Sequence, residues 1–117
     1  MRVLLSIKPK YVEQIFAGNK RFEYRKVIFK KNIDTIVIYE TKPISKIVGE
    51  LKISRIYNDN PEQIWSKTSA YSGISKDDFF QYFRGKEVAY AIEFKKVIKY
   101  NKPIDIKGYP PQSYKYI

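Results

Sequence analysis

The residues best suited to chemistry lie in one short run near the start of the sequence, GNKRFEYR at residues 18–25. Glu23 lies between two cations, Lys20 and Arg25, and neighbouring cations favour the ionised form of a carboxylate. On the concave face of a sheet the two cations can hold a phosphate, and Arg25 can do so through paired hydrogen bonds. The Glu23 carboxylate can accept a hydrogen bond from the exocyclic amine of cytosine or guanine. The same spacing equally suits an internal salt bridge that fixes a strand against a helix.

The composition excludes several kinds of catalytic site. The 117 residues include no histidine and no cysteine. These absences rule out a Ser-His-Asp triad, a thiol nucleophile, a Cys/His zinc site and any disulfide. The 12 acidic residues are mostly scattered, so we expect no metal ion and no cofactor. A reaction here would have to use Lys20 as the activating group and Glu23 as the base, with neighbouring hydroxyls.

Positive charge is concentrated at the two ends of the chain. The formal net charge is +11, and residues 1–31 hold nine basic and two acidic residues while residues 94–117 hold six and one. The middle segment, 32–93, has eight basic and nine acidic residues and is nearly neutral. If the two ends lie side by side, they form one basic face, whose natural partner is a polyanion and first of all a nucleic acid. A solvated basic surface without a specific partner has the same composition.

Other side chains extend the nucleic-acid hypothesis. Lys8, at the end of the first expected strand, can join the charged group, and Tyr39 or Trp65 can stack on an unpaired base. A lone tryptophan beside Ile64 on a short helix is more typical of a core residue. Sequence-independent phosphate contacts are expected from basic residues near the chain ends, each of which equally suits a solvated surface position: Arg2, Lys10, Lys95, Lys96 and Lys99.

These side chains need a scaffold, and the apolar pattern predicts one of the α+β class. A buried strand over residues 2–8 leads into a helix that Pro9 opens and Gly18 ends, with Tyr11 on its apolar face. An extended segment over residues 20–25 follows, with Phe22 and Tyr24 on one face and the charged residues Arg21, Glu23 and Arg25 on the other. The later elements expected are strands over residues 34–40, 46–57 and 88–100, and helices that begin at the capping residues Asn60 and Ser75.

We expect a single domain over residues 1–117. Its tail, residues 101–117, contains three prolines and three tyrosines, and a stiff Pro-Pro pair with aromatic neighbours favours a segment that packs on the sheet. No apolar run approaches the ~20 residues of a membrane span, and the first residues lack the pattern of a signal peptide. A cytoplasmic monomer is therefore the expectation.

The run LLSIKPKYVEQIFAGNKRFEYRK, residues 4–26, resembles the opening of the ASCH domain family. Its signature, G-x-K-x-x-E-x-R, is matched in full by Gly18, Lys20, Glu23 and Arg25. The resemblance continues in Val48-Gly49-Glu50, in the Gly73-Ile74-Ser75 loop and in the strand AYAIEF at residues 89–94. It implies a PUA-like β-barrel of about five to six strands, mixed or antiparallel, with two to three short helices at its mouth. It also implies a basic cleft beside the signature that binds RNA, single-stranded in preference, or a modified nucleoside.

The resemblance also brings enzymatic alternatives. Some members of the family are amidohydrolases that deacetylate N4-acetylcytidine with a lysine, a threonine and a glutamate. The lysine falls on Lys20, the threonine on Glu23 and the glutamate near Ser72, which makes Ser72 a candidate for ligand contact. Because the nucleophile is replaced, we expect a binding protein rather than an enzyme. A ribonuclease that uses lysine, tyrosine and serine is a second alternative, and a basic module that binds an acidic protein is a third.

Overall fold

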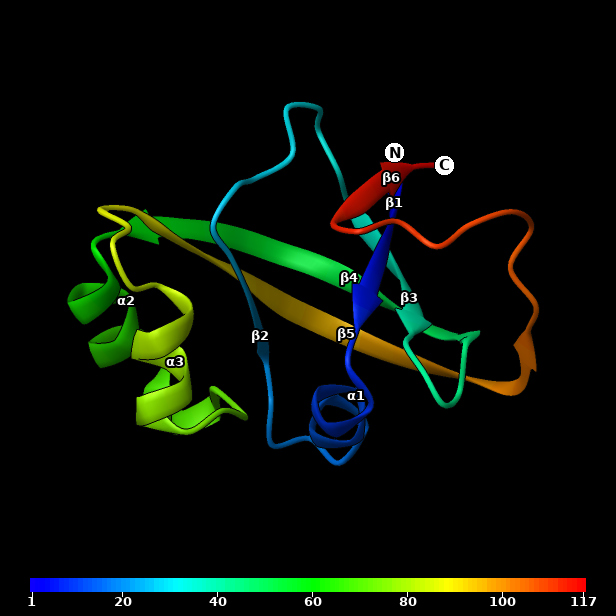
Figure 1. Cartoon of the computed structure of the whole chain (residues 1–117), viewed down its shortest axis with the longest axis horizontal. Coiled ribbons are helices and arrows are strands. Elements are labelled where there is room, and N and C mark those ends of the chain that lie inside the picture. Colours follow the sequence, from blue (N-terminus) through cyan, green and yellow to red (C-terminus); the bar gives the residue numbers. More distant parts are fainter.

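One strongly curved sheet organises the chain, and the computed structural model describes all of it, residues 1–117 (Figure 1). The strands are β1 (Arg2–Ile7), β2 (Phe22–Arg25), β3 (Thr35–Glu40), β4 (Lys46–Asp59), β5 (Ala89–Ile104) and β6 (Tyr114–Tyr116). Their order in the sheet is β2-β5-β4-β3-β1-β6, with β1 and β3 parallel and every other pair of neighbours antiparallel. Because β2 and β6 do not pair with each other, the sheet is a half-barrel with two edges. The predicted α+β class with a mixed sheet is confirmed.

Three helices are packed around this sheet: α1 (Pro9–Phe16), α2 (Pro61–Thr68) and α3 (Lys76–Tyr82). The predicted caps are confirmed, since the Asn60 side chain accepts from the Gln63 amide at 2.9 Å and Ser75 Oγ accepts from the Asp78 amide at 3.1 Å. Such a cap satisfies an amide at the start of a helix that has no partner within the helix. None of the helices is long and apolar enough to cross a membrane.

The apolar side chains form two main cores, one on each side of the charged strand β2. The larger has 13 buried residues from β1, α1, β3, β4, β5 and the segment between β2 and β3. The smaller has seven, including Phe22 and Tyr24 of β2 and Phe79 and Phe83 at α3. Side chains of a strand alternate between its two faces, so Glu23 and Arg25 point away from the smaller core. This alternation places the charged pair at the boundary between the two cores.

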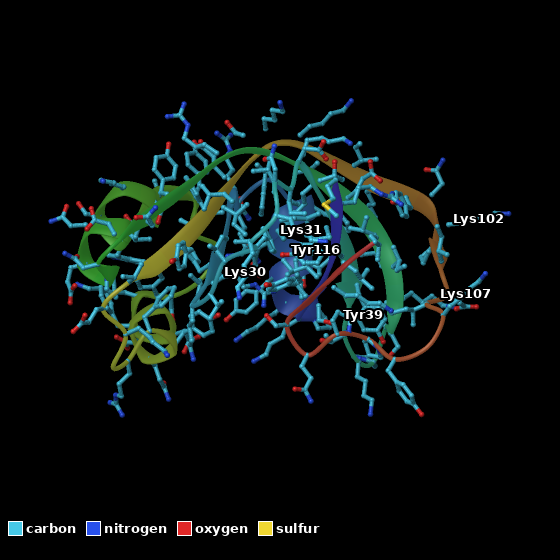
Figure 2. The ribbon with its side chains drawn as sticks, turned by 90° about the horizontal axis from the view of Figure 1, so that it is seen from above. Lys30, Lys31, Tyr39, Lys102, Lys107 and Tyr116 are labelled. Carbon is cyan, nitrogen blue, oxygen red and sulfur yellow. The ribbon has the colours of Figure 1, made fainter.

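The two basic ends of the chain lie in contact. β6 pairs with β1 so that Leu4 faces Lys115, and the two termini are neighbours in Figure 1. The segment before β6 is tied down as well, because Ser6 Oγ donates to the Pro111 carbonyl oxygen at 2.7 Å. β5 continues beyond the expected end at Tyr100, to Ile104, because Ile104 still pairs with Ile47 of β4. The contact places Lys115 beside β1, whereas other basic residues of the C-terminal segment lie elsewhere, including Lys102 and Lys107 at the far end of the molecule in Figure 2.

Candidate functional site

Three residues of the signature, Lys20, Glu23 and Arg25, line a cavity of about 390 Å³. Its walls come from the end of β1 and the start of α1, from β2, and from α3. Five cationic side chains face two carboxylates in this lining: Lys8, Lys10, Lys20, Arg25 and Lys26 against Glu23 and Asp78. Three tyrosines also line the cavity, namely Tyr11, Tyr24 and Tyr82, together with the polar residues Ser6 and Gln81. A concave site of this size, with several converging charged groups, suits a small polar ligand.

Lys20 lies at the buried end of the cavity and is only 3% exposed. Its Nζ donates to the Ser72 carbonyl oxygen at 2.7 Å, and its backbone forms an isolated bridge with Ser72. The ammonium also lies 4.7 Å from the centre of the Tyr24 ring and 5.3 Å from that of Tyr11. Aromatic faces attract cations, which offsets part of the cost of removing the ammonium from water.

Burial lowers the pKa of Lys20 from 10.5 to about 8, because the charged form loses its hydration. The Glu23 carboxylate opposes this shift and the Arg25 guanidinium adds to it. At neutral pH the side chain is still mainly protonated, and a minor fraction of the molecules carry the neutral amine. Lys20 can therefore act either as a buried cation or as a base.

The loop that holds Lys20 requires a glycine. Gly73 has φ +63°, and a Cβ built on it would lie 2.4 Å from the Lys20 Cβ and 2.7 Å from its Cγ. No side chain fits between this loop and the lysine stem, and the left-handed backbone disfavours other residues. Gly73 thus allows the backbone at Ser72 to approach the lysine closely enough for its carbonyl to accept the hydrogen bond.

Glu23 and Arg25 form a nearly buried ion pair, with 2.9 Å between Glu23 Oε2 and Arg25 Nη2. The same Nη2 donates to the Ser6 carbonyl oxygen at 3.1 Å, while Arg25 Nε is buried and has no partner. The internal salt bridge that the spacing suited is therefore present between Glu23 and Arg25. Both side chains also line the cavity, and the hydrogen bond from Arg25 to Ser6 fixes β2 against β1.

A buried hydroxyl chain supports Tyr24 from behind. Thr68 Oγ1 donates to the Ile64 carbonyl oxygen at 2.7 Å, so Tyr24 Oη must donate to Thr68 Oγ1, also at 2.7 Å. Burial raises the pKa of Tyr24 to about 12, which keeps the phenol protonated as this donor. The sequence placed Tyr24 on an apolar face but contained no local pattern that linked it to Thr68 on α2.

The structure brings together only some of the predicted site residues. Lys8, Lys10, Lys20, Glu23 and Arg25 line the cavity, and Ser72 touches Lys20 through its carbonyl. Sequence reasoning missed the other lining residues with suitable chemistry: Tyr11, Tyr24, Lys26, Asp78 and Tyr82. For Tyr11, which was predicted on the apolar face of its helix, the neighbouring Lys10 was the signal in the sequence that could have indicated a place in the site.

Both aromatic residues predicted to stack on a base lie outside the cavity lining. Tyr39 is 5% exposed and packs with Leu4 and Val37; Figure 2 shows it on the side of the C-terminal tail. The Trp65 ring lies 4.9 Å from that of Phe79, at the smaller core. The remaining predicted phosphate contacts are exposed on β1 and β5, away from the cavity lining: Arg2, Lys95, Lys96 and Lys99.

Comparison with known proteins defines the class of fold and then the family. The crystal structure of ASCH from Zymomonas mobilis superposes with a TM-score of 0.91 over 99% of this chain and 87% of that one, at 24% sequence identity. The fold is thus that of an ASCH structure, which confirms the predicted PUA-like architecture. The ASCH domain model matches residues 5–103, and the chain belongs to the ASCH domain family.

Two curated relatives match by sequence as well. An "ATP synthase subunit alpha" of Ureaplasma parvum serovar 3 is 31% identical over 108 residues, which are 92% of this chain and 14% of that protein. An "ASCH domain-containing ribonuclease" of Zymomonas mobilis subsp. mobilis is 27% identical over 89 residues, 75% of this chain and 60% of that protein. The chain spans less than two thirds of the length of each of these relatives.

Proposed function

We propose that this chain binds RNA, or a modified nucleoside, in the basic cavity beside Lys20. The observation that carries the proposal is the lining itself, in which five cationic side chains and three tyrosines surround about 390 Å³. A nucleotide combines an anionic phosphate with an aromatic base, and each part has a complementary partner in such a lining. The relative from Zymomonas mobilis that is named a ribonuclease supports RNA as the class of ligand.

In this proposal some lining residues contact the phosphate and others contact the base. The exposed lysines at the rim, Lys8, Lys10 and Lys26, would contact phosphate oxygens. Tyr82 or Tyr11 would stack on the base, a contact worth ~1–3 kcal/mol. Glu23 is held by Arg25 through one carboxylate oxygen, and the other oxygen would accept from an exocyclic amine.

A titration series tests this proposal. A panel of nucleosides and a single-stranded oligoribonucleotide would be added to the protein, with binding followed by NMR shifts and by calorimetry. We expect shifts around Lys20, Glu23 and Arg25, and a weakening of about 5- to 150-fold for Tyr82→Leu if that ring stacks on the base. The double variant Lys8→Ala/Lys10→Ala should lower the slope of log K against log salt by about 1.4, since each phosphate contact to a single strand contributes ~0.7.

The matched control removes two lysines elsewhere. Lys102 and Lys107 are exposed and lie at the far end of the molecule in Figure 2, so Lys102→Ala/Lys107→Ala lowers the net charge equally. Equal losses of affinity in the two double variants would mean that net charge alone drives binding. Shifts that avoid the cavity would also overturn the proposal.

RNA cleavage is a second candidate, favoured by the lowered pKa of Lys20. The neutral amine would take the proton of a 2′-hydroxyl, and the 2′-oxygen would bond to the adjacent phosphorus as the bond to the 5′-oxygen breaks. A cationic lysine at the rim, Lys8 or Lys10, would protonate the departing 5′-oxygen, leaving a 2′,3′-cyclic phosphate.

Labelled RNA incubated at pH 8.5 tests this candidate. The wild type should produce ends with a cyclic phosphate and Lys20→Met should not. Absence of cleavage above buffer would remove the nuclease and leave the binding proposal intact. N4-acetylcytidine incubated in parallel tests hydrolysis of a nucleoside amide, the remaining enzymatic alternative.

A further inference from the structure

Residues 26–33, which follow β2 and lead toward β3, carry positive charge from the wall of the cavity outward; we call this segment the basic loop. Its sequence is KVIFKKNI, and its three lysines are exposed. None of the three takes part in an ion pair. By contrast, four basic residues of the nearly neutral middle segment are each paired with a carboxylate: Lys46, Lys52, Arg55 and Lys67. The carboxylate that follows the loop, Asp34, is engaged by the N-terminal ammonium at 3.5 Å and by Thr35 Oγ1 at 2.9 Å.

The basic loop is held in place by the C-terminal strand. The Tyr116 hydroxyl oxygen accepts hydrogen bonds from the amides of Lys30, at 3.0 Å, and Lys31, at 3.3 Å. Phe29 is buried in the larger core, and the Tyr114 ring packs edge-on against it at 5.1 Å. Figure 2 shows Lys30 and Lys31 beside Tyr116. A loop fixed in this way loses little conformational entropy when its side chains bind a ligand.

The basic loop begins at the wall of the cavity. Lys26 is a lining residue, and its Nζ lies 4.5 Å from the centre of the Tyr82 ring. Lys30 follows four residues later, so its Cα is at most about 14 Å from that of Lys26. If one nucleotide of an RNA strand occupies the cavity, the phosphates next to that nucleotide lie within reach of the basic loop.

We propose that Lys30 and Lys31 bind the phosphates of a single-stranded RNA on one side of the nucleotide held in the cavity, and that Tyr116 positions these lysines. The inference rests on the proposed function and assigns to the protein a second, sequence-independent contact region outside the cavity. Lys31 Nζ lies 4.8 Å from the centre of the Tyr116 ring, a contact that leaves the N–H groups on the other side of the ammonium free for phosphate oxygens.

The test compares a mononucleotide, which reaches only the cavity, with a 12-nucleotide single-stranded RNA. Lys30→Ala/Lys31→Ala should leave the affinity for the mononucleotide unchanged. For the oligonucleotide it should lower the salt slope by about 1.4, equivalent to a loss of roughly tenfold at 0.15 M salt. The control Lys102→Ala/Lys107→Ala, with two exposed lysines at the far end of the molecule, should retain the wild-type slope.

Tyr116→Phe tests the positioning role separately. It keeps the ring and all the charges but removes the oxygen that accepts from the two amides. We expect a lower affinity for the oligonucleotide with an unchanged salt slope, because the phosphate contacts are still made but from a less ordered loop. A wild-type affinity would refute the positioning role.

The outcomes separate this inference from the proposed function. If the wild type binds neither the mononucleotide nor the RNA, the proposed function fails and the inference falls with it. If the wild type binds both, but the loop variant and its control have the same slope, only the inference fails. Binding of poly-glutamate in preference to RNA, lost in the loop variant, would overturn it in favour of an acidic protein partner.

Discussion

Replacing Gly73 by alanine tests how Lys20 is held. The new Cβ would lie 2.4 Å, 2.7 Å and 2.9 Å from Cβ, Cγ and Cδ of Lys20, well inside the ~3.5–4.0 Å of a normal carbon contact. Overpacking of this kind costs about 1–3 kcal/mol, and an L-residue in the left-handed region costs about 1–2 kcal/mol more. We therefore expect Gly73→Ala to lower the free energy of unfolding by about 2–5 kcal/mol.

Gly85→Ala is the matched control, because Gly85 also has a positive φ, +77°, but nothing lies within 4 Å of its added Cβ. It should lose only the backbone cost of about 1–2 kcal/mol. Thermal and chemical denaturation followed by circular dichroism would measure both variants. At about 4 °C per kcal/mol, the Tm should fall by about 8–20 °C for Gly73→Ala and by about 4–8 °C for Gly85→Ala.

The test is how much more unfolding free energy Gly73→Ala loses than Gly85→Ala. Equal losses in the two variants would refute the contact between the loop and the lysine stem. Lys20→Ala in the Gly73→Ala background removes two of the three clashing atoms, Cγ and Cδ. The double variant should therefore lose less stability than the two single variants combined. Displacement of the loop would also weaken the hydrogen bond from Lys20 Nζ to Ser72, so nucleoside affinity should fall for Gly73→Ala and not for Gly85→Ala.

Two further predictions concern the groups around Lys20. Since burial lowers its pKa from 10.5 to about 8, the unfolded chain binds more protons than the folded chain between these pH values, and stability rises with pH there. The difference in unfolding free energy between wild type and Lys20→Met, from chemical denaturation, should rise by about 3 kcal/mol across this window; a flat difference would contradict the burial of the ammonium. Thr68→Val leaves the Tyr24 hydroxyl without its acceptor and should cost about 1–3 kcal/mol in the same assay. If Tyr24→Phe in that background adds its full separate cost, the two hydroxyls are not coupled.

The sequence predicted correctly those features of the fold that depend on residues close together in the chain. The alternation of Phe22 and Tyr24 with Glu23 and Arg25 predicted two faces for β2, and the structure has an apolar face toward the smaller core and a charged face toward the cavity. Helix caps are equally local, since Asn60 and Ser75 each bond to an amide three residues on. These interactions depend on neighbours in the sequence and so leave a readable pattern.

The residues predicted to stack on a base show what local patterns in the sequence do not reveal. Tyr39 and Trp65 were selected because their rings can stack on a base, but residue type does not say which surface a ring faces. Tyr39 lies on the face of β3 that packs with Leu4 and Val37, and Trp65 packs on Phe79. The tyrosines that reach the cavity, Tyr11, Tyr24 and Tyr82, come from three different elements. Which aromatic residues share a cavity depends on how those elements pack.

The sequence by itself identified three charged residues of the candidate site, Lys20, Glu23 and Arg25, and the family to which the chain belongs. Only the tertiary structure decided the state of these groups. Burial lowers the pKa of Lys20, and the ammonium can be buried because Ser72, 52 residues further along the chain, accepts its hydrogen bond. The basic loop is held by Tyr116, 86 residues beyond Lys30. Burial and pairing are set by long-range contacts, which depend on the folded arrangement of the whole chain and not on the pattern of any one segment.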